Sequence, residues 1–198
     1  MNGFKIKPLP FPYNALDGIS EQQIRFHHDK HYVAYVNNRN DIEQKLKEMR
    51  NKGDFSAVRG LKLNESHNAS GMILHEIYFN CLGEKGGEPT GKLAEKIKED
   101  FGSFDKWKSE FLAIAKSSRG WVLLCFDPSD GKLHNYNVDF HDVGAVWESI
   151  PILALDIWEH AYYLDQGPNK DKYFEAFFKN LNWKWISEKF NKIYNQFK

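Results

Sequence analysis

The chain has 198 residues, of which 41% are hydrophobic and 15% aromatic, enough to bury the core of one domain or of two small, closely packed ones. Lysine plus arginine number 27 and equal aspartate plus glutamate, so the chain lacks the basic excess typical of nucleic-acid-binding proteins. No window is apolar enough for a membrane span, and we expect no membrane partner. Two distant cysteines, Cys81 and Cys125, favour reduced, buried thiols in a cytoplasmic protein over a disulfide.

The first part of the chain is predicted to be helical. Ser20, with Gln23 three residues later, forms a capping-box pattern and begins a helix that reaches about residue 36. Four polar residues, 37–40, are expected to interrupt or kink it. A second, charged helical stretch follows over 41–51 and ends at Gly53.

A glycine-rich segment divides the chain. A third helix is predicted over 66–82, and the run Gly-Gly-Glu-Pro-Thr-Gly at 86–91 then breaks the pattern. We therefore predict an N-terminal helical hairpin domain over 1–85, a linker over 86–91 and a C-terminal α+β domain over 92–198.

The second part mixes helices with strands. Apolar or alternating runs predict strands over 120–126, 132–139 and 150–155, with the turn Asp-Pro-Ser-Asp-Gly between the first two. Further helices are predicted over 92–101, 103–116, 170–181 and from 184 onward. The fold class is therefore α+β: an N-terminal α-helical hairpin domain plus a C-terminal α/β domain with a three-stranded antiparallel sheet.

A dense set of reactive side chains follows the third predicted strand. Residues 156–163 read Asp-Ile-Trp-Glu-His-Ala-Tyr-Tyr. Asp156 and His160 offer a carboxylate oxygen and a neutral nitrogen, which borderline first-row metal ions accept. The alternative is an Asp–His pair that opens a surface helix, with the aromatic residues in the core. The metalloprotease pattern H-x-x-E-H is excluded because position 156 is Asp.

The first predicted helix carries a second candidate group. His27, His31 and Tyr35 are spaced by four and share one helix face, which favours a site over isolated core histidines. His28 points about 100° away on an α-helix, and we expect it to be exposed.

The remaining histidines give weaker signals. His75 lies among apolar residues of the third helix, where core packing is the simpler interpretation. His141 stands near the end of the second strand. His67 and His134 have polar neighbours and are expected at the surface.

Several motifs, in order along the chain, point to one family. Residues 156–163 match the signature D-x-W-E-H-A-Y-Y, and residues 27–31, with Tyr35 beyond them, are similar to the pattern H-x-x-K-H. Further landmarks are Gly-Gly-Glu-Pro-Thr-Gly at 86–91, Gly120-Trp121 and Asn182-Trp183. From about residue 9 to residue 190 the chain resembles the iron/manganese superoxide dismutases.

The resemblance implies one iron or manganese ion per subunit, held by His27, His75, Asp156 and His160 with a solvent molecule as fifth ligand. It implies an antioxidant oxidoreductase that disproportionates superoxide to dioxygen and hydrogen peroxide by M(III)/M(II) cycling. Three imidazoles and one carboxylate leave a position open, as a catalytic site requires, whereas zinc is redox-inert. We expect iron to be slightly preferred and leave open that either metal is accepted.

The resemblance also implies roles around the metal. Tyr35 and His31 match the family's route for proton delivery, a task that suits a phenol beyond an imidazole. Family members carry a glutamine bonded to the solvent ligand, and here the two alternative positions are Gly71 and His141. We therefore expect His141 to bond to the metal-bound solvent. Trp121 and Trp158 would line the site.

The resemblance also implies the position of the substrate entrance and the quaternary structure. Lys170 aligns with the cation at the substrate entrance, which is usually arginine. The family forms dimers, so we expect a homodimer in which Glu159 reaches the partner's His160 and Tyr163 reaches the partner's His31. A tetramer is left open.

Two competing hypotheses remain. A mononuclear iron oxygenase uses two histidines and one carboxylate, but a third histidine at the right place argues against it. A helical protein that uses a metal only for stability is the non-enzymatic alternative.

Overall fold

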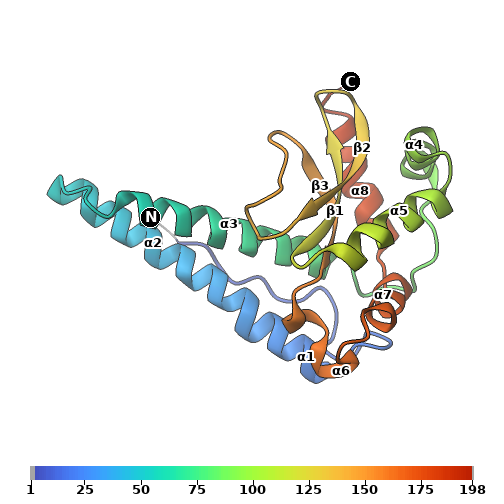
Figure 1. Ribbon diagram of the computed structural model, residues 1–198, viewed down its shortest axis with the longest axis horizontal. Coiled ribbons are helices and arrows are strands. Elements are labelled where there is room, and N and C mark those ends of the chain that lie inside the picture. Colours follow the sequence, from blue (N-terminus) through green and yellow to red (C-terminus); the bar gives the residue numbers. More distant parts are fainter. Residues whose placement is uncertain (1–2, 198) are drawn as a thin grey trace.

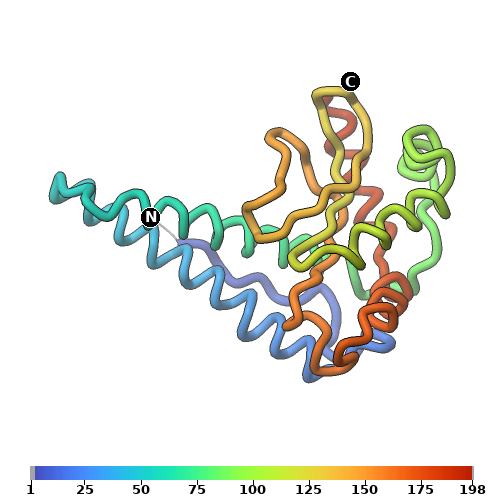
Figure 2. The backbone as a smooth tube through the Cα atoms, in the orientation of Figure 1, coloured from blue at the N-terminus to red at the C-terminus, as the bar shows by residue number. Residues whose placement is uncertain are grey.

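Two long antiparallel helices project from one side of the molecule, and a three-stranded sheet with shorter helices forms the other (Figures 1 and 2). The structure is a computed structural model that describes residues 3–197. The hairpin consists of α1 (Glu21–Phe26), a π-helical segment η1 (His27–Tyr32), α2 (Val33–Lys52) and α3 (Val58–Asn80). Within the described residues, no helix combines the length and apolarity needed to cross a bilayer.

The first helical run begins as predicted but is not interrupted at 37–40. The Ser20 hydroxyl accepts from the Gln23 amide at 3.1 Å, which caps α1. The predicted interruption is wrong, because the polar side chains there bond to other parts of the chain and not to their own backbone. Asn38 donates to Asn68 on α3, and Asn40 bonds both backbone groups of Phe4.

The first helical run does depart from a regular α-helix, but it does so before residues 37–40, in the π-helical segment η1. A π-helical turn bonds i to i+5, is wider than an α-turn and occurs often at functional sites. The predicted exposure of His28 is also wrong: the residue is buried, and its ring bonds the Lys7 carbonyl at 2.9 Å and the Asp29 carboxylate at 2.7 Å. Its face is covered because the extended N-terminal segment runs along this helix (Figure 2).

The sheet consists of β1 (Trp121–Asp127), β2 (Lys132–Val138) and β3 (Ile150–Asp156). It is antiparallel and has the strand order β2-β1-β3. The turn Asp-Pro-Ser-Asp-Gly joins β1 to β2, with Gly131 at φ 70°. The register places Trp121, the first residue of β1, opposite Asp156, the last residue of β3. The elements of this part are α4 (Gly91–Phe101), α5 (Phe104–Ser117), β1 (Trp121–Asp127), β2 (Lys132–Val138), β3 (Ile150–Asp156), η2 (Glu159–Ala161), α6 (Tyr163–Gln166), α7 (Lys170–Lys179) and α8 (Trp183–Tyr194).

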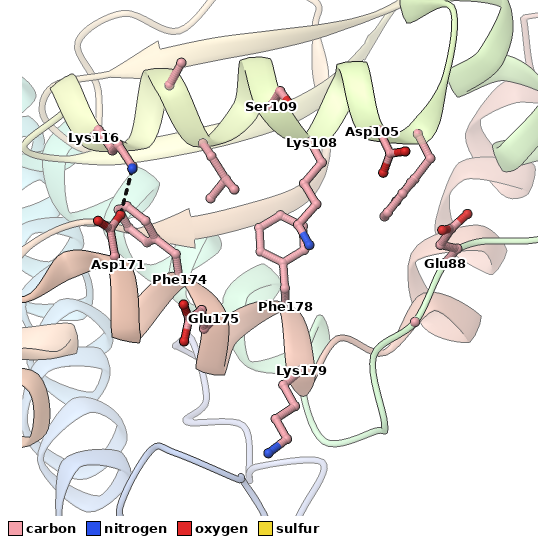
Figure 3. Close-up of a pocket in the computed structure, with 14 residues that line it drawn as sticks. Glu88, Asp105, Lys108, Ser109, Lys116, Asp171, Phe174, Glu175, Phe178 and Lys179 are labelled. Carbon is pink, nitrogen blue, oxygen red and sulfur yellow. Dashed lines mark ion pairs between the residues drawn. The ribbon is translucent and has the colours of Figure 1, made fainter.

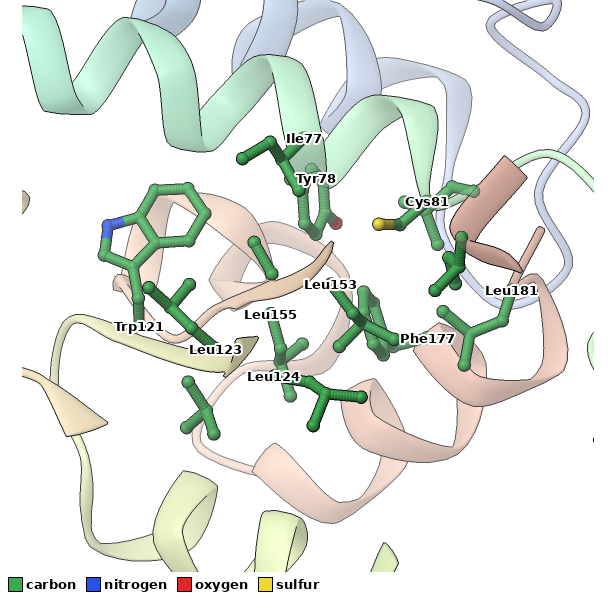
Figure 4. Close-up of a cluster of buried hydrophobic side chains, with 14 of the residues drawn as sticks. Ile77, Tyr78, Cys81, Trp121, Leu123, Leu124, Leu153, Leu155, Phe177 and Leu181 are labelled. Atoms are coloured by element: carbon green, nitrogen blue, oxygen red, sulfur yellow. The ribbon is translucent and has the colours of Figure 1, made fainter. Parts of the chain in front are cut away.

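The hydrophobic core joins the two parts. The C-terminal half of α3 packs against β3, and leucines from β1 and β3 meet α3 and the segment around α7 (Figure 4). Each buried leucine side chain contributes about 1.5–3 kcal/mol of transfer free energy. Side chains that point from α3, η1 and the end of β3 are therefore held at one seam. The labelled core residues are Ile77, Tyr78, Cys81, Trp121, Leu123, Leu124, Leu153, Leu155, Phe177 and Leu181.

Candidate metal centre

Four potential metal ligands from three regions of the chain meet at this seam. His27 opens η1, His75 lies in α3, Asp156 ends β3 and His160 lies in η2. One ligand atom of each lies within 4.8 Å of those of the other three. His27, His75 and Asp156 are fully buried, and His160 is half-buried. The structure thus brings together the four residues that the family resemblance implied.

The three imidazoles converge on a single carboxylate oxygen. The Nε2 atoms of His27, His160 and His75 lie 3.1, 3.2 and 3.6 Å from Asp156 Oδ2. The Trp158 amide donates to the other oxygen of Asp156 at 2.9 Å, which fixes the carboxylate plane. Oδ2 therefore faces the space between three nitrogen atoms.

Two buried nitrogen atoms of the ligand histidines lack hydrogen-bond partners within the described residues. They are Nδ1 of His27 and Nε2 of His75. The Gly71 carbonyl can only accept, so the N–H group of His75 at Nδ1 donates a hydrogen bond to it at 2.7 Å. The other ring nitrogen, Nε2, therefore carries no proton and keeps a free lone pair. A buried lone pair beside a carboxylate is costly without a partner. A cation at this point would satisfy it, so the donor set fits a metal ion.

The protonation states also fit metal binding. Burial lowers the pKa of His27 and, more strongly, that of His75, so both imidazoles are neutral. Burial alone would raise the pKa of Asp156, but the charge and hydrogen bond of His160, together with the hydrogen bond of His27, outweigh it and hold that pKa far below its usual range. Neutral imidazoles and an ionised carboxylate are the forms that bind metals.

A hydrogen-bonded chain runs beside the four ligands. The Trp121 indole N–H donates to His141 Nδ1 at 2.8 Å, and His141 Nε2 lies 2.7 Å from the Tyr35 hydroxyl. An indole can only donate, so Nδ1 accepts and the ring proton sits on Nε2. Burial lowers the pKa of His141 to about 4, so the ring is neutral. His141 therefore donates to Tyr35, whose own O–H proton is left for another acceptor. Both ring nitrogens of His141 are then engaged, so a link from His141 to metal-bound solvent would run through Tyr35 and not through the direct bond that we expected.

Gly71 makes room for this chain. A Cβ atom at Gly71 would lie 2.8 Å from Cδ1 of the Tyr35 ring, closer than real Cβ contacts. The helix position can therefore hold no side chain unless Tyr35 moves. The polar group beside Tyr35 comes instead from His141, in the connection that follows β2.

His31 lies against a different ligand. Its ring stacks on that of His160, with centroids 4.0 Å apart and planes 13° apart. Of the three residues spaced by four, His27 belongs to the ligand group, His31 lies beside His160, and Tyr35 lies beside His141. The three residues surround the centre from one helical run.

A surface cavity of about 430 Å³ opens beside His160. Lys170, the predicted entrance cation, lines it, and its ammonium donates to the Ser118 carbonyl at 3.0 Å. Trp158 also lines it and lies parallel to the His160 ring. The predicted contact residues Glu159, in η2, and Tyr163, in α6, are both exposed.

Two contributors were missed from the sequence. The His67 ring lies 4.6 Å from that of His141, and its Nδ1 is 3.4 Å from the Asp142 carboxylate. The sequence did contain a signal for His67, because His67, Gly71 and His75 are spaced by four and so share one face of a helix. Gln23 is buried, and its amide donates to the His160 carbonyl at 2.6 Å, which ties α1 to η2. Only the folded structure reveals that contact.

Two other features are separate from this centre. Asp127, Asp130 and His134 cluster at the β1–β2 turn, where the carboxylates cap backbone amides and bond to Tyr136 and His134. A cavity of about 910 Å³ lies between α5 and α7 (Figure 3). It is lined by aromatic and charged side chains, with an ion pair between Lys116 and Asp171 at 2.9 Å.

Comparisons with known proteins agree with the geometry. Residues 3–83 match the family model described as iron/manganese superoxide dismutases, alpha-hairpin domain, and residues 89–189 match the model for the C-terminal domain. A superoxide dismutase [Mn] of Halobacterium salinarum is 44% identical over all of both chains, and one of Haloferax volcanii is 47% identical over 92% of each. A superoxide dismutase [Fe] of Aquifex aeolicus is 40% identical over 97% of this chain and 94% of its own length.

Proposed function

The chain belongs to the iron/manganese superoxide dismutase family, and we propose that His27, His75, Asp156 and His160 hold its single metal ion. The protein is a superoxide dismutase: it converts two superoxide anions and two protons into dioxygen and hydrogen peroxide. The observation that supports this ligand set is the convergence of three Nε2 atoms on Asp156 Oδ2. When bound, iron or manganese supplies one-electron redox chemistry, which zinc cannot.

In this proposal the residues around the ligands deliver protons. The hydroxyl of Tyr35 is protonated at neutral pH, as a phenol ordinarily is, and burial raises its pKa further, to about 12. His141 donates to the oxygen of Tyr35, so the Tyr35 proton can point toward a group bound at the ligands. Trp121 fixes the tautomer of His141 and hence the direction of this chain. His31, stacked on His160, is the second proton-carrying group on the entrance side.

Either iron or manganese can load the site in this proposal. Relatives of similar identity are named for manganese in Halobacterium salinarum and Haloferax volcanii and for iron in Aquifex aeolicus. These names give no support to a preference for iron. Imidazole and carboxylate ligands suit both ions, and selection between them depends on geometry, the surrounding hydrogen bonds and supply.

Reconstitution tests the function directly. The metal is removed with a chelator, and iron and manganese are returned separately before metal content and superoxide consumption are measured. We expect one ion per subunit and activity with at least one metal. Stoichiometric loading with activity in neither form would contradict the assignment.

The role of His141 can be tested with His141→Gln. Glutamine also accepts from Trp121 and donates to Tyr35, but it places its donor differently. We expect the reduction potential of the bound metal to shift and the ratio of iron-supported to manganese-supported activity to change about 10-fold or more, the usual scale for outer-sphere partners of a metal ligand. Potentiometry and assays of both metal forms measure these effects.

His134→Gln is the matched control, because His134 lies in β2, just before the connection that carries His141, but bonds Asp130 at the β1–β2 turn. It should change neither quantity. The role given to His141 is wrong if its own variant keeps both the potential and the metal ratio of the parent.

Assembly and location complete the proposal. Glu159 and Tyr163 are exposed beside the ligand His160, which supports a homodimer built across this surface, and a tetramer stays open. Two free, buried thiols, Cys81 and Cys125, fit a cytoplasmic antioxidant enzyme. We also retain the division into 1–85, the linker 86–91 and 92–198 as a proposal.

A further inference from the structure

His67 lies beside the proton-delivering pair of His141 and Tyr35. Its ring centroid is 4.6 Å from that of His141 and 6.2 Å from that of Tyr35. His67 belongs to α3, about two turns before the ligand His75, whereas His141 lies in the connection between β2 and β3. The His67 ring therefore packs where this connection meets the helical hairpin.

The connection between β2 and β3 depends on side-chain contacts for its position. It covers residues 139–149 without helix or strand, and residues 143–148 are all exposed. Two neighbouring residues tie its first part to the hairpin (Figure 1): His141 bonds α2, and Asp142 contacts His67 of α3. His141 is thus placed by a segment without a regular ladder of backbone hydrogen bonds, the kind of segment that opens locally.

Asp142 has two donors on α3, and His67 is the firmer one. Nδ1 of His67 lies 3.4 Å from one carboxylate oxygen, and the Ser66 hydroxyl lies 3.3 Å from the other. The Ser66 hydroxyl has one proton to give and lies closer to the Leu63 carbonyl, at 3.0 Å. An ionised carboxylate only accepts, so Nδ1 of His67 carries a proton and donates it to Asp142. The side chains of this pair are 38% and 23% exposed, so water screens it only in part.

We propose that His67 is a positioning residue, which together with Asp142 fastens the β2–β3 connection to α3. The pair keeps the His141 ring between its donor Trp121 and its acceptor Tyr35. Both of these hydrogen bonds are directional, so they form together only while the His141 ring stays in one place. His67 therefore acts on proton delivery through His141. The inference rests on the proposed function and deepens it.

Hydrogen exchange at the Trp121 indole tests the position of His141 without turnover. The indole N–H is protected while it donates to His141, and NMR follows its exchange in the zinc-loaded and the metal-free protein, both of which are diamagnetic. We expect His67→Phe, which keeps a ring but loses the donor, to speed this exchange about two- to fivefold, the scale of a partly exposed pair. Asp142→Asn should act alike, and the double variant should do no more than either single change. His67→Gln, whose amide can donate to Asp142, should restore most of the protection.

Stopped-flow assays of the fully metallated proteins separate proton delivery from capture of the anion. In the proposed function, protons reach the centre through the chain that contains His141, and a proton donor loses efficiency steeply when it is misplaced. We therefore expect His67→Phe to lower kcat about threefold. The ratio kcat/KM reports capture of superoxide by the free enzyme and should stay unchanged.

His134 and Asp130 provide a matched control pair. They also join an imidazole to a carboxylate, at 2.9 Å, and their side chains are 36% and 41% exposed, but they lie at the β1–β2 turn. His134→Phe and Asp130→Asn should lower the Tm about as much as the changes at His67 and Asp142. They should leave both the exchange of the Trp121 indole and kcat as in the parent.

Three results would overturn the inference. They are a His67→Phe variant with the parent's indole exchange, an equal acceleration in His134→Phe, and a His67→Gln variant that protects the indole no better than His67→Phe. A parent inactive with both metals would instead defeat the assigned function. Exchange at the Trp121 indole would still test the role of His67 in that case.

Discussion

Replacing Asp156 by Asn should leave a folded protein that retains neither iron nor manganese and has no measurable dismutase activity. The substitution removes the only carboxylate among the four ligands and places an amide where three Nε2 atoms converge. Losing one of four ligands costs roughly 3 kcal/mol of binding, or about 10²-fold in affinity, with a further loss from the missing negative charge. Metal analysis after dialysis and a superoxide assay measure the effect.

Thermal unfolding separates this loss from misfolding. A ligand at about 10³ times its dissociation constant stabilises the native state by about 4 kcal/mol, which raises the Tm of a chain of this size by roughly 10 °C. The parent should show that rise when metal is added, and Asp156→Asn should not. In the metal-free state the variant should be less stable than the parent at neutral pH, because the folded state holds the pKa of Asp156 far below its usual range and so favours the ionised carboxylate that Asn lacks.

Asp127→Asn provides a matched control. Asp127 also ends a strand and is buried, but its carboxylate bonds Ser129 and Tyr136 at the β1–β2 turn. Its replacement should cost about 1–3 kcal/mol of stability and leave metal content unchanged. An Asp156→Asn variant that retains a full metal complement after dialysis would show that the carboxylate is not a ligand.

The sequence predicted the separate elements that carry the metal ligands better than it predicted that these elements come together. The apolar run before Asp156 predicted a buried strand, and the spacing of His27, His31 and Tyr35 predicted one functional helix face. His75, read by itself, pointed only to core packing. That it meets Asp156 depends on α3 packing against β3, a contact between segments far apart in sequence. Family motifs supplied the pairing that local patterns could not.

The wrong predictions about the first helical run arose from structure that local sequence patterns do not encode. Reading helix faces at 3.6 residues per turn assumes a regular α-helix, but η1 is π-helical and carries His27 at its start. The expected break at 37–40 and the expected exposure of His28 both failed because distant segments supplied hydrogen-bond partners. Local propensity cannot foresee such partners. The tautomer of His141 is set in the same way, by Trp121 on the neighbouring strand.

Glu159→Ala should weaken metal retention and dimerisation together. Glu159 is exposed in the single chain although it precedes a metal ligand. In the proposed dimer its carboxylate accepts from the imidazole of the partner's His160, which fixes the orientation and tautomer of that ligand. Removing such a partner typically costs 10–100-fold in metal affinity or activity. Competition with a chelator measures the affinity, and sedimentation at several concentrations measures the dimer.

Glu175→Ala is the control, since Glu175 is an exposed glutamate on α7 that lines the separate cavity between α5 and α7. It should change neither quantity. Glu159→Gln keeps a hydrogen-bond acceptor without the charge, so it should keep the dimer better than it keeps the metal. Tyr163, half-exposed beside Glu159, gives an independent check through Tyr163→Phe, which should weaken the dimer alone. A dimeric, fully metallated and active Glu159→Ala protein would show that the ligand His160 is oriented within one chain, with Gln23 at its carbonyl as the remaining support.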